Sequence, residues 1–356
     1  MGQAGEETHM PEAVYPAPGM KGPLWRRSLF RKCLTWYRTS RSRKRLRGID
    51  QDQSLSLVSP QQFRQLADSD LPLVFLCRND RRLLPSFLKH YRSLGVTRFI
   101  CVDDRSTDGS AEFLQSQPDL DLWTSSQRYK DARRGKAWRE GLFRTYGINR
   151  WYLNIDSDEF LIYERCFENP LPVLIRRLGA QSINRLAAPM LDMYPLNDIA
   201  AAEFTGEDER MPWQIADCYD RDGYEVVKND RFVRIRGGVR KRVFGADVDL
   251  MKYPLLFWDK DCSLGENIHQ PLPYDRNFSP IFGVLLHFKF FSDYQERVQQ
   301  AIDGGQHFGG AREYVNMMEK ISANPDMAFG YSGSAHFSGP DQLVVQGFVA
   351  PVFEGR

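Results

Sequence analysis

Three acidic side chains, Asp156, Asp158 and Glu159, interrupt an apolar, β-prone run at residues 150–163, RWYLNIDSDEFLIY. A buried strand normally excludes carboxylates, because an unpaired buried charge costs several kcal/mol or is neutralised. In an extended chain Asp156 and Asp158 project to the same side, and paired carboxylate oxygens suit a hard divalent cation such as Mg2+ or Mn2+. The run therefore predicts a cation site at a strand end. The alternative is a solvated turn that holds no ligand.

Two other polar segments follow apolar runs in the same way: residues 78–80, Arg-Asn-Asp, and residues 102–110, VDDRSTDGS. A carboxylate at a strand end can accept the N3–H of a uracil ring, while nearby hydroxyls cap the following helix. Asp108 fits the role of an N-cap as well as that of a ligand.

The elements that would position these groups alternate between strand and helix patterns. Strand patterns occupy 71–77, 98–102, 120–124 and the acidic run, and helical patterns between them occupy 83–94, a stretch beginning at Thr107, and 138–146. This alternation predicts right-handed βαβ units and a mostly parallel, Rossmann-like sheet flanked by helices. Ligands of such sheets bind at the carboxyl ends of the strands, where all three polar segments would meet.

The chain after residue 165 is less regular. Short strands are predicted at 183–191, 231–236 and 282–290, and a helix at 293–303. We therefore predict one α/β domain over 71–340, with a regular half at 71–165 and an irregular half at 166–340. The remaining segments are predicted as a disordered tail at 1–20, a basic amphipathic segment at 21–47, a linker at 48–70 and a C-terminal tail at 341–356.

The composition indicates a globular protein. The 356 residues are 42% hydrophobic and 13% aromatic, enough to bury a substantial core. No run approaches 18 apolar residues, and the first 20 residues lack the apolar core of a signal peptide. The cysteines occur singly with no CxxC pair, which argues against a zinc site or a disulfide scaffold and favours a reducing, cytoplasmic location. They are Cys33, Cys77, Cys101, Cys166, Cys218 and Cys262.

The positive charge of the chain is concentrated near its N-terminus. Residues 21–47 contain 11 Lys or Arg and no Asp or Glu. At helical spacing the apolar residues of this segment fall on one face; they are Trp25, Leu29, Phe30, Cys33, Leu34, Trp36 and Tyr37. A basic amphipathic helix of this kind fits an in-plane anchor on an anionic membrane. The alternative is a helix docked on the core. No recognition motif supports nucleic-acid binding.

The polar segments, taken in order, resemble the family 2 glycosyltransferases of the GT-A fold. They are more narrowly similar to a bacterial family-2-like subgroup related to family 92 enzymes. The resemblance covers about residues 70–320, and although each motif alone is weak, their order and spacing are specific. Asp80 stands where Glu is usual, which is a conservative departure. The matching segments are Arg78-Asn79-Asp80, HYRSLG (90–95), VDDRSTDGS (102–110), DSDEF (156–160), PMLDMYP (189–195), GGVRKRVF (237–244) and LLHFKF (285–290).

The resemblance implies an α/β fold of the GT-A type, with a nucleotide-sugar half at 71–165 and an irregular acceptor-side half at 166–340. It implies a metal-dependent glycosyltransferase that moves a sugar from a nucleotide-sugar to a hydroxyl of a glycan, polysaccharide or glycolipid. The expected donor is a UDP-sugar, and the expected stereochemical course is inversion. The expected cofactor is Mn2+ or Mg2+. The expected setting is cell-surface polysaccharide biosynthesis, in the cytoplasm or peripherally on the inner face of the plasma membrane.

Individual residues carry the roles that the resemblance implies. Asp158 would ligate the metal with His287 as a further ligand, and Asp156 would contact the ribose or the metal through water. The other nucleotide-sugar contacts are expected from Arg78, Asn79, Asp80, Asp103, Asp104 and Arg240.

The leaving diphosphate needs charge stabilisation, to which the basic run Arg240-Lys241-Arg242 would add. An inverting transfer also needs a carboxylate to take the acceptor proton. Asp192 is the first candidate for this base, with Glu266 and Asp217 as weaker ones. The role of Glu159 is left open between a ligand and a residue that orients the ligands.

Other classes of protein explain the sequence less well. A nucleotidyltransferase would usually place a Gly-rich loop after the first strand to cradle a triphosphate, but residues 76–94 contain no Gly. A metal-dependent hydrolase usually needs two metals and several His or Asp ligands. The chain has six histidines, which is weak support for this class. A non-catalytic membrane-associated scaffold would account for the basic segment but leaves the acidic run unexplained.

Overall fold

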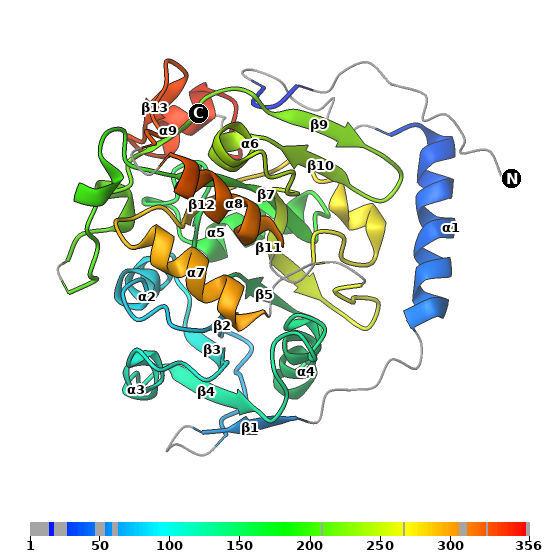
Figure 1. Ribbon diagram of the computed structural model, residues 1–356. Coiled ribbons are helices and arrows are strands. Elements are labelled where there is room, and N and C mark those ends of the chain that lie inside the picture. The colour runs from blue at the N-terminus through cyan, green and yellow to red at the C-terminus, as the bar shows by residue number, and fades with distance from the viewer. Residues whose placement is uncertain are drawn as a thin grey trace, which may run out of the picture.

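The computed structural model describes residues 14–17, 27–46, 54–58, 63–207, 209–265, 268–305, 312–324 and 327–353. These residues form one large mixed sheet with helices on both faces (Figure 1). The predicted disordered tail at 1–20 lies outside the described residues except for 14–17, where Tyr15 is buried and its hydroxyl donates to the carbonyl of Phe348.

The regular half of the sheet has the predicted βαβ arrangement. Four parallel strands lie in the order β4-β3-β2-β5, and side chains alternate between the two faces along each strand. Leu73 and Phe75 face α2 and α3, whereas Val74 and Ile100 face α4. The elements are β2 (Pro72–Cys77), α2 (Leu84–Ser93), β3 (Arg98–Asp103), α3 (Ser110–Gln115), β4 (Leu120–Ser125), α4 (Lys136–Tyr146) and β5 (Arg150–Asn154).

The acidic run is not the single strand that we predicted. β5 ends at Asn154, and a separate strand, β6 (Glu159–Ile162), begins four residues after Ile155 at the far end of the sheet. Between them the chain turns, and the Glu159 N–H donates to the Asp156 carbonyl at 3.1 Å. The apolar residues on each side belong to different strands, so Asp156 and Asp158 lie in the turn between them and Glu159 is the first residue of β6. The same-side argument for two residues in extended chain therefore does not apply.

The irregular half completes the sheet in the order β5-β11-β7-β12-β6. Three predicted strands and the predicted helix are present as β7 (Arg185–Met193), β10 (Val233–Arg236), β12 (Val284–Phe288) and α7 (Tyr294–Gly304). The strand β11 (Met251–Trp258) was not predicted, although it lies between β5 and β7. Its pattern is interrupted by Lys252 and Pro254, and its register with β7 shifts between Lys252 and Leu255. The α/β fold class of the prediction is confirmed.

The remaining elements cover the sheet or extend its edges. β1 falls within the predicted linker, and residues after 340 pack on the main core through Leu343, Phe348 and Val349. No helix among the described residues is long and apolar enough to cross a membrane. These elements are α1 (Leu29–Leu46), β1 (Leu55–Leu57), α5 (Leu171–Ala180), η1 (Ile199–Ala201), η2 (Pro212–Gln214), β8 (Cys218–Asp220), β9 (Glu225–Lys228), α6 (Gly238–Phe244), η3 (Tyr274–Asn277), α8 (Arg312–Ala323), β13 (Ser334–His336) and α9 (Pro340–Val345).

Candidate functional site

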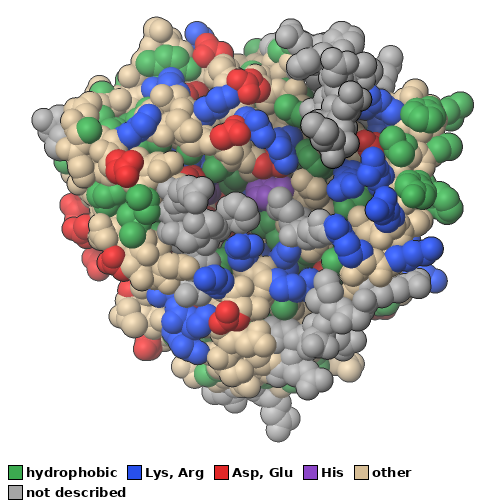
Figure 2. All heavy atoms as spheres, turned by 45° about the vertical axis from the view of Figure 1, so that its right-hand side comes forward, with side chains coloured by type: hydrophobic (Ala, Val, Ile, Leu, Met, Phe, Trp, Pro, Cys, Tyr) green, Lys and Arg blue, Asp and Glu red, His purple; other side chains and the backbone are tan. Residues whose placement is uncertain are grey.

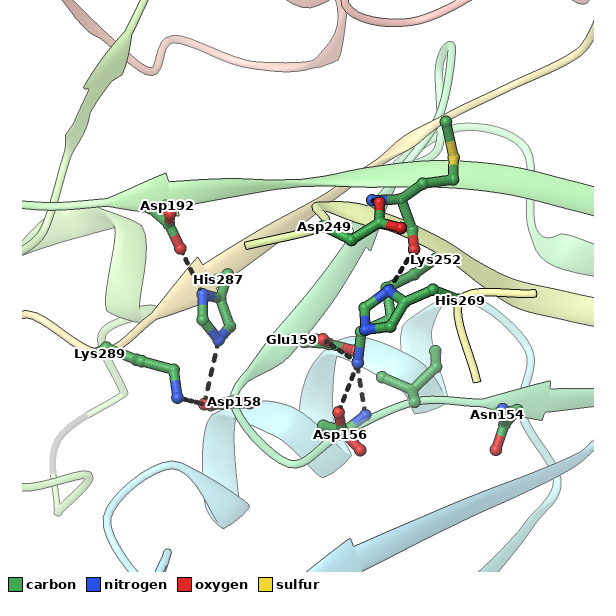
Figure 3. A network of polar contacts seen from close by, with 12 residues as sticks. Asn154, Asp156, Asp158, Glu159, Asp192, Asp249, Lys252, His269, His287 and Lys289 are labelled. Atoms are coloured by element: carbon green, nitrogen blue, oxygen red, sulfur yellow. Dashed lines mark hydrogen bonds and ion pairs between the residues drawn. The ribbon is translucent and has the colours of Figure 1, made fainter. Parts of the chain in front are cut away.

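Two cations, the half-buried Lys252 and the buried Arg139, balance part of the acidic run between β5 and β6. Lys252 of β11 donates from Nζ to Asp156 Oδ2 at 2.7 Å and lies 3.1 Å from Glu159 Oε1. Arg139 of α4 pairs with the other oxygen of Asp156. Figure 3 shows Asp156 and Glu159 directed at the same ammonium group. Burial by itself raises the pKa of Asp156, but Lys252 and Arg139 bring it below its usual value.

Asp158 of the same turn faces a different group of residues. Its Oδ2 lies 3.3 Å from His287 Nε2 and 3.9 Å from Lys289 Nζ. The other ring nitrogen of His287, Nδ1, donates to Asp192 Oδ1 at 2.5 Å (Figure 3). Parallel pairing of β12 with β7 sets His287 directly opposite Asp192. The register of the sheet therefore fixes this contact.

The ionisation of this group follows from its contacts. Burial opposes charge on each member, yet the carboxylates of Asp158 and Asp192 raise the pKa of His287 above its ordinary value. In the same way burial would raise the pKa of Asp158, but His287 and Lys289 hold it well below the usual range. Asp192 is shifted downward against burial by Arg240 and His287, so its carboxyl pKa is also low. The histidine lies between two ionised carboxylates.

The spacing at Asp158 fits a divalent cation. Two ligands at right angles and about 2.1 Å from an ion are about 3 Å apart, and the separation here is 3.3 Å. A carboxylate that accepts from the far nitrogen of a ligating histidine is a usual partner in metal sites, because it fixes the ring and its tautomer. Asp192 has that position. Glu159 also offers an oxygen within 4.8 Å of the Asp158 and His287 ligand atoms, although Lys252 already binds it.

One residue of the basic run on α6 joins this site. Arg240 donates from Nε to Asp192 Oδ2 at 2.8 Å, and its Nη1 lies 3.6 Å from Glu313 Oε1. Its Nη2 is buried and has no hydrogen-bond partner within the part of the chain that the structure describes. Lys289 adds a second positive group, held at 3.0 Å by the hydroxyl of Tyr314.

The other two residues of the basic run lie away from it. Lys241 pairs with Glu225 at 2.6 Å, and Arg242 forms two hydrogen bonds to Asp220. The structure brings only Arg240 to Asp192.

The carboxyl end of β3 presents acceptors of another kind. Asp103 Oδ1 and Asp104 Oδ2 are buried, and neither has a hydrogen-bond partner among the described residues. Arg128 Nε reaches the other oxygen of Asp104 at 3.2 Å, and Arg78 Nη1 lies 3.7 Å from Asp104 Oδ2 without a hydrogen bond. Burial raises the pKa of Asp104 above its ordinary value. Buried acceptors without donors usually mark a place where a water or ligand binds.

Asn79 and Asp80 are engaged inside the protein. Asp80 accepts from Arg297 at 2.5 Å and from the hydroxyl of Ser157 at 2.6 Å, which ties the end of β2 to the acidic turn. Asn79 has a left-handed backbone with φ of 57°, and its side chain accepts from the Thr107 N–H. Both contacts position the loops around the site.

Several site residues were not predicted from the sequence. Lys252 and Arg139 neutralise the acidic turn, Arg297 holds Asp80, and Lys289 stands beside Asp158. A single Lys within the apolar run MKYPLLFW carries the same signal as carboxylates in an apolar run, namely a buried charge that needs a partner. The weaker base candidate Asp217 immediately precedes β8, and its Oδ2 lies 2.8 Å from His336 Nδ1. Glu266 lies outside the described residues.

One face of the molecule is hollowed (Figure 2). Figure 2 shows a histidine side chain at the floor of a hollow, with Lys and Arg side chains along its rim. A basic rim of this kind favours entry of an anionic ligand.

Comparison with known proteins gives little support for any one family. No family model matches the chain, and no curated protein matches it. Among solved structures, a mannosyltransferase from Pyrobaculum calidifontis in complex with GDP-Man and Mn2+ aligns at 15% identity over 45% of this chain and 43% of that chain, with a TM-score of 0.26. The match therefore spans less than half the length of that protein.

Two longer alignments involve other activities. UDP-glucose pyrophosphorylase from Acinetobacter baumanii aligns at 9% identity over 76% of this chain and 87% of that chain, with a TM-score of 0.27. An inositol-1-phosphate CTP transferase from T. maritima aligns at 12% identity over 81% of this chain and 98% of that chain, with a TM-score of 0.25. Scores this low carry no argument about activity. The function must be argued from the site.

Proposed function

We propose that the protein is a metal-dependent glycosyltransferase that uses a nucleotide-sugar donor. The donor that we expect is a UDP-sugar. The observation that carries the proposal is the Asp158–His287 pair, 3.3 Å apart and backed by Asp192, at the sheet edge where Asp103 and Asp104 each have one buried oxygen without a hydrogen-bond donor among the described residues. The pair would hold Mn2+ or Mg2+ on the diphosphate. The acceptors at the end of β3 would bind the nucleoside.

Each part of the site has a role in this proposal. A divalent cation held by Asp158 and His287 would neutralise charge on the leaving diphosphate. Arg240, with a buried N–H unpaired in the described part of the chain, and Lys289 would bind the diphosphate oxygens. Carboxylates at the end of β3 accept hydrogen bonds, so they suit uracil or guanine, which carry a ring N–H. Cytosine presents an acceptor at the same ring position and would be disfavoured.

A nucleotidyltransferase is the main alternative, and one observation weighs against it. A triphosphate is usually cradled by free backbone N–H groups in the loop after the first strand. Here the N–H groups of Asn79, Asp80 and Arg81 donate instead to Ser106 Oγ, Ser110 Oγ and Asp108 Oδ2 at 2.9–3.1 Å. Side chains of the β3–α3 loop thus occupy the donors that a triphosphate would need.

The test is to incubate the protein with a panel of UDP-, GDP- and CDP-sugars, with and without Mn2+. Two quantities are measured: consumption of the donor and the unfolding temperature of the protein. We expect UDP to stabilise the protein only with Mn2+ and a UDP-sugar to be hydrolysed slowly in the absence of acceptor. Release of pyrophosphate from CTP or UTP in the presence of a sugar phosphate would instead identify a nucleotidyltransferase. Stabilisation by no nucleotide would favour a non-catalytic scaffold.

Asp192 has two competing roles. The predicted role as base, in an inverting transfer, requires it to release Arg240 or His287, since both its oxygens are engaged. We favour a positioning role in which it holds His287 toward Asp158. The acceptor remains a hydroxyl of a glycan, polysaccharide or lipid-linked sugar. A cytoplasmic, membrane-peripheral setting in cell-surface polysaccharide biosynthesis is part of the same proposal.

A further inference from the structure

Helix α1 is attached to the domain by its polar face. Three small polar residues are its buried members: Thr35, Thr39 and Ser42. Thr35 Oγ1 donates to the Asp230 carbonyl at 2.7 Å, and the Tyr274 N–H donates to Thr39 Oγ1 at 3.2 Å. These directional contacts fix how the helix is turned about its axis.

The opposite face of α1 is apolar and exposed. Leu29, Phe30 and Trp36 have exposed fractions of 80%, 77% and 73%, and Tyr37 has 54%. A helix of a globular protein normally buries its apolar face on the core, and the docked-helix alternative for this segment would require that. In the structure α1 instead buries its polar face and exposes its apolar one. An exposed apolar stripe of this size is typical of a surface that binds a partner.

Positive charge surrounds this apolar stripe. Lys32, Arg41, Lys44 and Arg45 of α1 are exposed, and the helix contains no Asp or Glu. Figure 2 shows the apolar group at one edge of the molecule with Lys and Arg side chains next to it, on the same side as the hollow that contains the histidine. The outer face of α1 therefore combines apolar side chains with basic ones.

We propose that the outer face of α1 lies in the surface of an anionic membrane. An 18-residue helix is about 27 Å long, and along this length Trp36 and Tyr37 have the amphipathic rings that favour the interface. The apolar side chains would enter the acyl boundary while the basic ones meet lipid phosphates. A protein groove would explain the apolar stripe but not an accompanying surface with only positive charge. The inference does not depend on which donor the active site uses.

The test is co-sedimentation of the full chain with vesicles of phosphatidylcholine alone or with about 30% phosphatidylglycerol. We expect binding to the anionic vesicles only. The triple variant Leu29→Ser/Phe30→Ser/Trp36→Ser should bind at least about tenfold more weakly. Its unfolding temperature should be unchanged, because these side chains are exposed.

A matched control removes exposed apolar side chains from other places. Phe167 and Val345 have exposed fractions of 56% and 76%, and the variant Phe167→Ser/Val345→Ser should bind vesicles like the wild type. The variant Arg41→Gln/Lys44→Gln should lose the preference for anionic lipid. Equal vesicle binding by the triple variant would overturn the proposal. So would a dimer in solution that only the triple variant abolishes, because the occupant would then be a second copy of this chain.

A second group of possible metal ligands lies apart from the active-site residues. It consists of Asp217, Cys218 and His336. Cys218 of β8 stands opposite His336 of β13 in an antiparallel pair. The backbone of Cys218 bonds to Tyr194 rather than to His336, and side chains lie closest at such non-hydrogen-bonded pairs. His336 Nδ1 lies 3.3 Å from Cys218 Sγ and 2.8 Å from Asp217 Oδ2.

The three donor atoms lie within 4.8 Å of one another, and two of the contacts share one ring nitrogen. In a Cys–His–Asp relay the thiol and the carboxylate contact different ring nitrogens, but here both contact Nδ1. Ligands of a tetrahedral ion, about 2.0–2.3 Å from it, are about 3.3–3.8 Å apart; the Cys218–His336 distance of 3.3 Å lies in this range, and the His336–Asp217 distance of 2.8 Å would have to lengthen when an ion binds. We infer that Asp217, Cys218 and His336 bind Zn2+, with water as the remaining ligand. The ion would link β13 to β8. The cysteine spacing gives no sign of this site, because Cys218 and His336 are 118 residues apart.

Cobalt substitution tests this site separately from the active site. Co2+ bound to a thiolate gives a sulfur-to-metal charge-transfer absorption, and no cysteine lies among the active-site residues described above. We expect the absorption in the wild type and in Cys262→Ser, and its loss in both Cys218→Ser and His336→Asn. An absorption that persists in Cys218→Ser, or its absence from the wild type at one equivalent of Co2+, would overturn the inference.

Discussion

Two groups of carboxylates lie at the carboxyl edge of the sheet, and their charges are balanced differently. In the acidic turn and on β7, the oxygens of Asp156 and Asp192 are all engaged by Lys, Arg or His side chains. At the end of β3, Asp103 and Asp104 each have one buried oxygen without a donor in the described part of the chain. The first group is complete without a ligand. The second group is not.

The difference separates residues that build the site from residues that bind. A buried carboxylate with cations on both oxygens is stabilised in place and has little to offer a ligand. A buried acceptor without a donor costs free energy until a ligand satisfies it. Asp158 is intermediate, since its contacts to His287 and Lys289 are 3.3 and 3.9 Å long, whereas Asp156, although 37% exposed, has a cation on each oxygen. On this comparison, Asp158 is the member of the acidic turn that is free to bind a metal.

The largest effect is expected from Asp158→Asn. Charge stabilisation by a divalent cation contributes several kcal/mol, and about 1.4 kcal/mol corresponds to a factor of ten in rate. Transfer from the nucleotide-sugar should therefore fall by roughly a thousandfold, and Mn2+ binding followed by electron paramagnetic resonance should be lost. Asp119→Asn, at an exposed pair with Arg92, serves as the control. Full activity in Asp158→Asn would show that the site works without this ligand.

Lys252→Met should have the largest effect on stability. It would leave the buried Glu159 without its ammonium and the partly exposed Asp156 without one of its two cations; removing one partner of a buried pair such as Lys252–Glu159 costs about 3–5 kcal/mol. Lys241→Met is the matched control, because its 2.6 Å pair with Glu225 is exposed and should contribute less than about 1 kcal/mol. Urea unfolding of both variants measures the difference. Equal losses would contradict the distinction between a completed buried cluster and a surface pair.

Asp192→Asn distinguishes a positioning residue from a base. If Asp192 orients His287, the variant should bind Mn2+ about 10–100-fold more weakly, and excess Mn2+ should restore part of the rate. If it is the base, Mn2+ affinity should be unchanged and kcat should fall at every metal concentration. Asp220→Asn is the control, since Asp220 is equally buried and bonded to Arg242 but does not contact His287. It should leave Mn2+ affinity unaltered.

The regular half of the fold could be predicted because its signals are local. β2, β3, β4 and the helices between them follow apolar runs and helical spacings of a few residues, and their order forces the polar ends to one edge. The prediction of a single strand for the acidic run was wrong. An apolar, β-prone pattern cannot distinguish one strand from two consecutive strands that lie at different places in a sheet. β11 was missed because Lys252 and Pro254 hide its pattern.

The balance of charge in the site could not be predicted. Lys252 and Asp156 are paired across 96 residues, and His287 and Asp192 across 95. Such partners are chosen by strand order and register, which the sequence pattern does not specify beyond the βαβ units. The assignment of Asp192 as a base was made on residue type and place in the chain. The contacts that favour a positioning role are visible only in the folded protein.

Asp104→Asn should have the smallest effect. We expect it to weaken UDP binding and, at neutral pH, to raise the stability of the protein. It should weaken UDP binding about tenfold, because one acceptor of the nucleoside is replaced by an amide. Burial raises the pKa of Asp104 above its ordinary value of 3.8, so ionisation is less favourable in the folded protein than in the unfolded one. Stability contributed by the neutral carboxyl is therefore lost as pH rises from the ordinary value through the raised one.

The Asn variant lacks this loss, so above that window it should unfold a few degrees higher than the wild type. At a pH below the ordinary value the two proteins should unfold at the same temperature. Asp108→Asn is the control from the same loop, since both its oxygens accept from backbone N–H groups and its removal should destabilise the protein at neutral pH. Thermal unfolding across pH, with and without UDP and Mn2+, measures both effects. Destabilisation of Asp104→Asn at neutral pH would mean that Arg78 and Arg128 already satisfy this carboxylate, and that the two groups of acids do not differ in the way argued above.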